Sequence, residues 1–77
     1  MPRPIPDIDL HGKTVAEAER IFEEWLNRSR VDGHLIEMQF IVGTGKIMDR
    51  LKGLAKEYGL NAYVPLGNRG CLVVEFE

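Results

Sequence analysis

The stretch CLVVEF, residues 71–76, is apolar at every position except Glu75. An apolar run of this length is typical of a strand that has neighbours on both sides and is covered by other elements. The turn GNRG separates it from a second extended run, residues 62–66. Pro65 in that run cannot donate a hydrogen bond to a sheet, which favours an edge position. We therefore predict that residues 71–76 insert inside the sheet and that residues 62–66 form an edge strand.

Two amphipathic helices and two more strands are predicted before this pair. Thr14 and Glu17 form an S/T-x-x-E capping box, after which apolar residues recur at helical spacing. A second helical pattern follows the GTG sequence and is stopped by Gly59. The predicted elements, in order, are strand 8–11, helix 15–29, strand 36–42, helix 47–58, strand 62–66 and strand 71–76.

The handedness of the connections predicts how these elements assemble. Helical connections between neighbouring parallel strands are right-handed in the great majority of cases, so two connections stepping in the same direction place both helices on one face. Strand parity then directs one set of side chains toward the helices: Ile8, Leu10, Met38 and Phe40. It directs another set to the open face or its rim: Asp9, His11, Glu37 and Gln39. The predicted fold class is α/β, a two-layer βαβαββ sandwich whose four-stranded mixed sheet has the order 1-2-4-3.

Size and charge limit the class of protein. The 77 residues, 44% hydrophobic and 29% charged, suffice for one small domain, residues 7–77, preceded by a flexible proline-rich tail, residues 1–6. The single cysteine, Cys71, cannot form a disulfide within the chain, which indicates a reducing, cytoplasmic location. No apolar run approaches the roughly 18 residues of a membrane span. A net charge of −2 argues against binding to nucleic acid through a general basic excess, so any phosphate-binding surface must be local.

The first candidate site is D-x-H-G, residues 9–12. On a strand, Asp9 and His11 would lie about 6 to 7 Å apart on one face. Histidine is the usual proton donor or acceptor at neutral pH, and an aspartate beside it can orient it, hold a metal or position water. The alternative is structural: Asp9 accepts backbone amides at the start of the helix, and His11 packs as a turn residue. The pattern alone leaves both interpretations open.

The second candidate site is the GTGK sequence between a predicted strand and a predicted helix. Free amides and the helix dipole favour an anion there, and phosphate is the obvious one. The sequence is too short for a Walker A motif. Glycines that merely permit a tight turn, and charged helix faces that are merely solvated, are the alternative. The candidate phosphate-binding residues are Gly43, Thr44, Gly45, Lys46, Arg50 and Arg69. We assign no chemistry to His34, expected to be exposed, or to Phe22, Trp25 and Cys71, expected to pack in the core or sheet.

In order and spacing, residues 8–76 resemble the small MutS-related (Smr) domain family. IDLHG, residues 8–12, is similar to the family's LDLHG, and VGTG, residues 42–45, resembles its H/T-G-x-G loop. GCLVVEF, residues 70–76, is similar to its glycine-led last strand. The resemblance implies a fold like the C-terminal domain of a bacterial translation initiation factor. It also implies an endonuclease that hydrolyses RNA or DNA or, alternatively, a noncatalytic nucleic-acid-binding module of repair or RNA surveillance.

The resemblance assigns roles to individual residues. Asp9 and His11 match the acidic and imidazole positions of the first motif, and Gly43 and Gly45 match the glycine loop. His11 would act as general acid or base, and Asp9 would position it or a water held by Mg²⁺ or Mn²⁺. Val42 departs from the family's histidine or threonine, so we expect slow cleavage that Val42→His would raise.

Several alternatives stay open at the level of the sequence. The polymer can be RNA or DNA, and the chain can be a monomer or a domain of a larger protein; a membrane partner is not expected. A third class of function is a protein-interaction domain that uses the open face of the sheet, which the acidic pI near 5.7 mildly favours.

Overall fold

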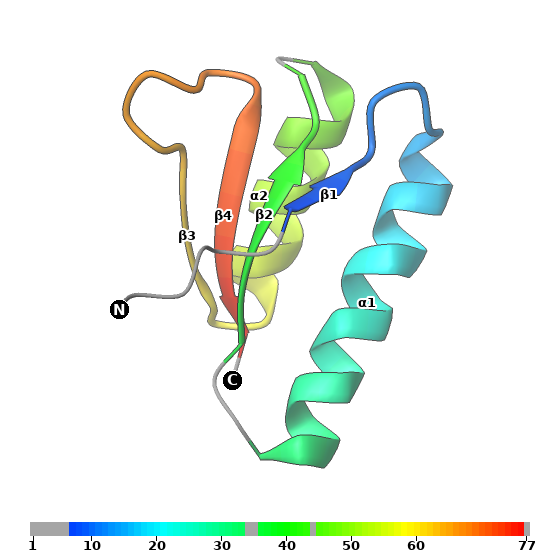
Figure 1. Ribbon diagram of the computed structural model, residues 1–77. Helices are drawn as coiled ribbons and strands as arrows, with labels where there is room; N and C mark the ends of the chain where they lie inside the picture. The colour runs from blue at the N-terminus through cyan, green and yellow to red at the C-terminus, as the bar shows by residue number, and fades with distance from the viewer. Residues whose placement is uncertain (1–6, 34–35, 44, 77) are drawn as a thin grey trace.

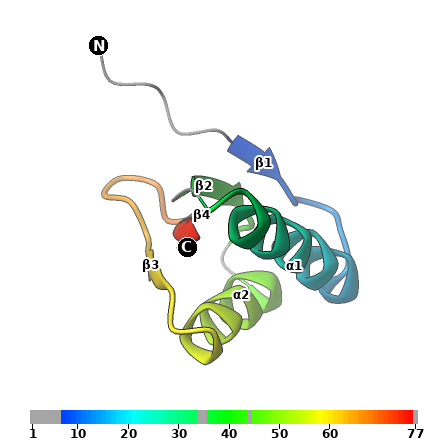
Figure 2. The same ribbon diagram turned by 90° about the horizontal axis from the view of Figure 1, so that it is seen from below.

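The computed structural model describes residues 7–33, 36–43 and 45–76 (Figure 1). It contains, in chain order, β1 (Asp7–Asp9), α1 (Val15–Asp32), β2 (Ile36–Ile41), α2 (Lys46–Glu57), β3 (Asn61–Tyr63) and β4 (Cys71–Phe76). The strands form one sheet in the order β1-β2-β4-β3; β1 and β2 are parallel, and β4 runs antiparallel to both of its neighbours. Both helices lie on the same face of this sheet (Figure 2). The predicted α/β fold and its strand order are confirmed.

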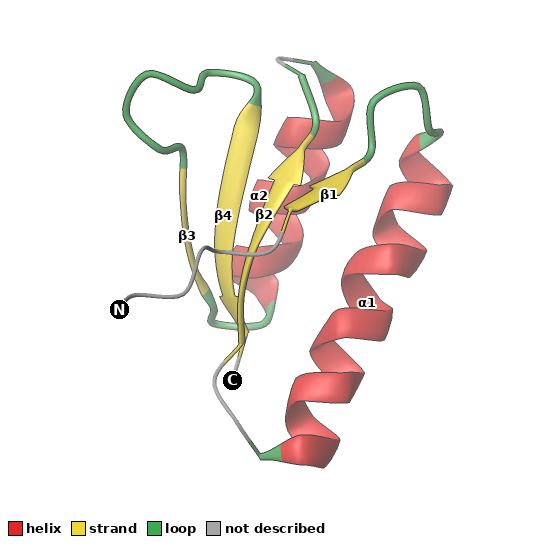
Figure 3. Cartoon of the chain, in the orientation of Figure 1, coloured by secondary structure: helices red, strands yellow, loops and turns green. Residues whose placement is uncertain are grey.

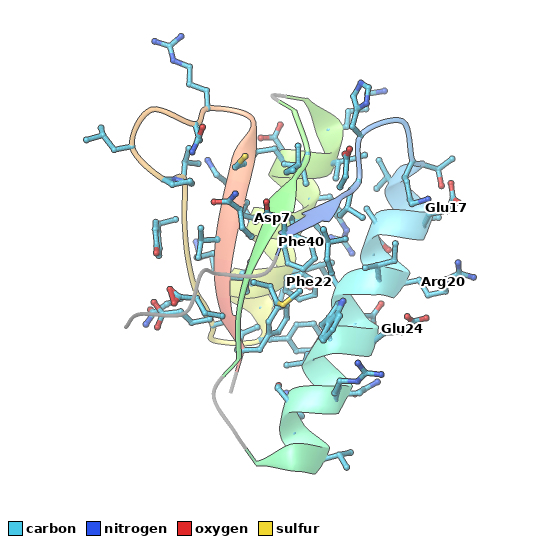
Figure 4. All side chains as sticks on the ribbon, viewed as in Figure 1. Asp7, Glu17, Arg20, Phe22, Glu24 and Phe40 are labelled. Atoms are coloured by element: carbon cyan, nitrogen blue, oxygen red, sulfur yellow. The ribbon has the colours of Figure 1, made fainter. Side chains whose placement is uncertain are left out.

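The core fills the space between the sheet and the helices. Phe22 of α1 packs against Phe40 of β2 and Phe76 of β4, with ring centroids 6.1 and 5.0 Å apart (Figure 4). Such aromatic pairs stabilise a core by roughly 0.5 to 1.5 kcal/mol beyond the area they bury. Leu10 and Met38 are buried beside them, and Ile8 packs against the same cluster, as strand parity predicted.

The opposite face of the sheet is acidic. Register and parity place four carboxylates on it: Asp7, Asp9, Glu37 and Glu75. The Tyr63 hydroxyl donates a hydrogen bond to Glu37 Oε1 at 3.3 Å, and Gln39 Nε2 donates one to Asp7 Oδ1 at 3.5 Å. Val73 lies between these polar neighbours and is only 1% exposed. The predicted outward direction of Asp9, Glu37 and Gln39 is therefore confirmed.

Helix α1 begins where the sequence predicted and ends later. Thr14 Oγ1 accepts from the Glu17 amide at 3.1 Å, and Glu17 Oε1 accepts from the Thr14 amide at 3.0 Å, which completes the capping box. The predicted end near residue 29 is wrong, because the helix continues to Asp32 and Gly33 caps it by donating to the Ser29 carbonyl at 2.9 Å. Of the two helices in the described chain, neither combines the length and the apolar character needed to cross a membrane.

Three strands are shorter than predicted, and of these β2 ends one residue early, at Ile41. β1 ends at Asp9, so His11 lies in the turn that follows and not on the strand. β3 ends at Tyr63, so Pro65 lies in the loop after it, where its carbonyl accepts a hydrogen bond from the Asn68 amide at 3.0 Å. β3 is at the edge of the sheet as predicted, although Pro65 is not one of its residues.

Candidate functional site

The candidate residues gather at one edge of the sheet. β1 and β2 are parallel, so both end there, and β4 begins there because Asp9 and Cys71 both pair with Ile41. Figure 3 shows the connecting loops in green along this edge. We call it the carboxyl edge; it comprises the β1–α1 loop (residues 10–14), the β2–α2 loop (residues 42–45) and the β3–β4 loop (residues 64–70). Thr44, a candidate phosphate ligand, and His34 lie outside the described residues.

Asp9 fixes the position of His11 through the backbone. Its Oδ1 atom accepts a hydrogen bond from the His11 amide at 2.8 Å, which is the geometry of an Asx turn. The expected placement of both side chains on one strand face is wrong, because the chain turns after Asp9. As in the structural alternative, Asp9 accepts a backbone amide, although in the turn before α1 and not at the helix start, and His11 is exposed and not packed. Its imidazole is therefore accessible to a ligand, and it is not enclosed by the core residue Phe22.

The β2–α2 and β3–β4 loops are joined by backbone hydrogen bonds. The Gly70 carbonyl accepts from the Val42 amide at 2.8 Å and from the Gly43 amide at 2.9 Å. Gly43 has a φ of +72°, a left-handed conformation that glycine adopts without steric penalty. A Cβ atom on Gly70 would lie 3.4 Å from the Gly43 Cα atom, so the two backbones are in close contact. The Gly43 amide is therefore already used by the protein and is not free to hold a phosphate.

The N-terminus of α2 keeps the features of an anion site. Gly45 is its N-cap residue, and no side chain within the described ranges caps this end. The amides of the first helical turn have no partner inside the helix, and they point toward the carboxyl edge. Lys46, the first helical residue, is exposed and adds a positive charge. Asp49 lies in the same turn and opposes an anion, so the site is only moderately positive.

The carboxyl edge has one exposed cation in the β1–α1 loop, Lys13, one at the start of α2, Lys46, and one in the β3–β4 loop, Arg69. The sequence analysis did not select Lys13, although it directly follows the His-Gly pair. Arg50 behaves differently, because its Nε atom donates to Glu19 Oε1 and so joins α2 to α1. This hydrogen bond, together with the Glu19 charge, raises the pKa of Arg50 above its usual range. The structure therefore supports a helix-packing role for Arg50 and gives no support to phosphate binding.

Position 42 belongs to the core. The Val42 side chain is 6% exposed and packs in the same cluster as Phe22 and Phe40. A histidine there would lie among apolar side chains and would not be presented to a ligand at the carboxyl edge. Trp25 is partly buried against that cluster, with the Arg28 guanidinium 4.9 Å from its ring centroid, so the predicted packing role of Phe22 and Trp25 is confirmed.

Asp9, the last residue of β1 and next to the carboxyl edge, has a carboxylate that could bind a divalent cation. Among the residues that the structure describes, no cluster of three or more His, Cys, Asp or Glu side chains could hold a metal ion. Mg²⁺ commonly uses one or two carboxylates and completes its shell with water and substrate phosphate, a requirement that a single aspartate can serve. Comparisons of the chain with models of protein families, with curated proteins and with solved structures found no match.

Proposed function

We propose that the carboxyl edge binds the phosphate backbone of RNA or DNA and that the chain is an Smr-like domain. One observation carries the proposal: two loops and the start of α2, from separate parts of the sequence, each present an exposed cation, Lys13, Arg69 and Lys46, at the end of the sheet where His11 is exposed. Cations and helix N-termini are the groups with which proteins hold phosphates.

The charge on the open face supports confinement of the nucleic acid to this edge. The open face carries Asp7, Asp9, Glu37 and Glu75 and, among its described strand residues, no lysine or arginine. A phosphate backbone laid across it would meet like charge, which disfavours association. The carboxyl edge is the neighbouring surface where cations are available. The acidic face remains the surface for the alternative function, an interaction with another protein.

Cleavage of the bound strand is a second proposal, favoured by the exposure of His11. Its imidazole would act as general acid or base on the phosphodiester, while Asp9 holds the turn that presents it. If a divalent cation takes part, Asp9 would hold it, and the cation would supply activation of a water molecule. Cys71 is a free thiol, which fits the cytoplasmic location that we include in the proposal.

Salt-dependent binding tests the phosphate site. Fluorescence anisotropy with labelled RNA and DNA should show that Lys13→Gln, Lys46→Gln and Arg69→Gln each reduce the slope of log affinity against log salt by about 0.7 to 0.9. Lys56→Gln is the matched control, because it removes the same charge about 15 Å further along α2. An equal loss in Lys56→Gln would show that binding is not localised. No salt-dependent binding by the wild type would instead favour the protein-interaction alternative.

Substitution of Asp9 separates the possible roles of its carboxylate in cleavage. Incubation with labelled RNA and plasmid DNA, with and without Mg²⁺ or Mn²⁺, should show cleavage that His11→Ala abolishes. Asparagine also forms Asx turns, so Asp9→Asn keeps the turn and removes the charge, whereas Asp9→Ala removes both. Loss in both variants indicates a metal-binding or proton-transfer role; loss only in Asp9→Ala indicates that Asp9 positions His11. Undiminished cleavage in His11→Ala would exclude the catalytic proposal.

A further inference from the structure

The β3–β4 loop, together with the end of β3, exposes three large apolar side chains within residues 63–66, which we call the apolar cluster. Of the five large apolar side chains exposed in the described residues, three are Tyr63, Val64 and Leu66, exposed by 45%, 38% and 104%. The other two are Val31, near the end of α1, and Tyr58, whose ring stacks on the buried Phe22 with centroids 6.4 Å apart. Single exposed apolar residues are ordinary, but several adjacent ones are typical of a binding surface.

Hydrogen bonds give this loop a defined shape at the carboxyl edge. The Asn68 amide donates to the Pro65 carbonyl at 3.0 Å, and the Cys71 amide donates to the Asn68 carbonyl at 3.1 Å, so two turns follow each other. Leu66 occupies a central position of the first turn, which explains its complete exposure. The Gly70 carbonyl then ties the loop to the amide of Gly43. Leu66 and Arg69 thus lie in a loop that is joined to the proposed phosphate site through Gly70.

The charge of the loop suits a polyanion, whereas the adjoining face does not. Residues 64–70 contain one cation, Arg69, and no carboxylate. Tyr63 lies between this loop and the acidic open face, where its hydroxyl donates to Glu37. Partial burial, together with the Glu37 charge, raises the pKa of the Tyr63 hydroxyl above its usual value. A nucleic-acid strand held at Lys46 can therefore continue over the β3–β4 loop. The carboxylates of the open face would repel its phosphates and so oppose a path over that face.

We propose that the β3–β4 loop binds unpaired nucleotides, with Leu66 contacting an exposed base and Arg69 the adjacent phosphate. The inference rests on the proposed nucleic-acid binding and adds the class of substrate, single-stranded RNA or DNA. In a duplex the faces of the bases are stacked on each other and out of reach, whereas in a single strand they are free to pack against a side chain. Leu66 therefore contributes to single-strand binding and contributes nothing to duplex binding.

Paired measurements on one oligonucleotide test this. Fluorescence anisotropy is recorded with a labelled single strand and with the same strand annealed to its complement. Leu66→Ser should weaken single-strand binding about fivefold or more, because the leucine loses its apolar contact with a base against which it is half-buried. It should leave duplex binding and the salt slope unchanged. Arg69→Gln should lower the slope for the single strand by about 0.7.

Two controls match these substitutions. Val31→Ser removes another exposed apolar side chain, in the last turn of α1, whose end lies opposite the carboxyl edge in Figure 1. Arg20→Gln removes a cation on the outer side of α1, where Figure 4 shows it pointing away from the sheet. Both should bind like the wild type. Because Leu66 is fully exposed, Leu66→Ser should keep the wild-type circular dichroism and unfolding midpoint.

Four outcomes would overturn the inference. If Leu66→Ser binds the single strand like Val31→Ser, the loop has no role, although the proposed phosphate site stands. If Leu66→Ser weakens the duplex equally, the loop does not select unpaired bases. If the wild type forms a dimer in sedimentation that Leu66→Ser dissociates, the cluster is a contact between copies of this chain. Wild-type protein that binds neither oligonucleotide rejects the proposed function itself, and the inference with it.

Discussion

Replacing Val42 by histidine tests whether position 42 belongs to the core or to the site. The Val42 side chain is 6% exposed. Removing it forfeits roughly 1.5 to 3 kcal/mol of apolar burial, and a buried imidazole without a hydrogen-bond partner adds a penalty of roughly 1 to 3 kcal/mol. The expected loss is therefore about 2.5 to 6 kcal/mol. A domain of 77 residues has a total free energy of unfolding of only roughly 4 to 12 kcal/mol. Val42→His should therefore lose a large share of its free energy of unfolding, and higher activity is not expected.

Urea unfolding followed by the fluorescence of Trp25, the only tryptophan, measures this loss. Val42→Ala and Val42→Thr are the controls, expected to lose about 2 kcal/mol each, from lost apolar contacts and from a buried hydroxyl respectively. Burial disfavours the charged imidazole, so the unfolded state of Val42→His binds more protons below about pH 6.5. Its stability should therefore fall further between pH 7 and pH 5 than that of the wild type. A variant as stable as the wild type at both pH values, with increased cleavage, would refute this reasoning and place residue 42 at the carboxyl edge.

Two further predictions concern the backbone and the start of α1. Gly43→Ala should lower the free energy of unfolding by about 1 to 2 kcal/mol, because the φ of Gly43 is +72°. Gly53→Ala should raise it by about 1 kcal/mol, because alanine favours a helix interior more than glycine does. The urea midpoints of the two variants should therefore shift in opposite directions. Thr14→Ala should cost about 1 kcal/mol. The Thr14 amide and hydroxyl lower the pKa of Glu17 below its usual 4.5, so this stabilisation is present above pH 4.5 and is lost as the pH falls through the lowered value. The melting temperatures of Glu17→Ala, which removes the carboxylate, and wild type should therefore converge in acid; a constant difference from pH 7 to pH 3 would count against this part of the capping box.

The fold was predictable because local pattern and chain topology agree. The apolar run at residues 71–76 is buried on both faces: Leu72 and Val74 face the helices, and Val73 is buried on the other side. Such a strand has to lie inside the sheet, and this fixed the order 1-2-4-3. The end of α1 was missed because Asp-Gly is typical of a turn, and here the glycine is a cap after one more helical turn.

The site was less predictable because its contacts are nonlocal. The alternation of side chains along a strand was assumed to continue to His11, two residues past the end of β1. The chain turns there instead, because the Asp9 carboxylate accepts a hydrogen bond from the His11 amide. The Gly43 amide donates to the Gly70 carbonyl because β4 pairs with β2, and these two residues are 27 positions apart in the sequence. The pairing of Arg50 with Glu19 depends on how the helices pack. Residue type selected the candidates, but it did not show which of their groups were already occupied by contacts within the protein.

The negative net charge of the chain is compatible with a phosphate site because charges act over short distances. At physiological salt the screening length is about 8 Å, so a bound phosphate senses the carboxyl edge and not the whole molecule. Near this edge, Asp9 and Glu17 already accept backbone hydrogen bonds, while no ion pair among the described residues involves Lys13, Lys46 or Arg69. Three such contacts give a slope of about −2.1 to −2.7 in log affinity against log salt, so affinity should fall about 20- to 40-fold between 50 and 200 mM salt. A steeper dependence would require cations beyond this edge, of which Lys52 and Lys56 on α2 are exposed, and a shallower one would mean that the three loops do not bind the backbone together.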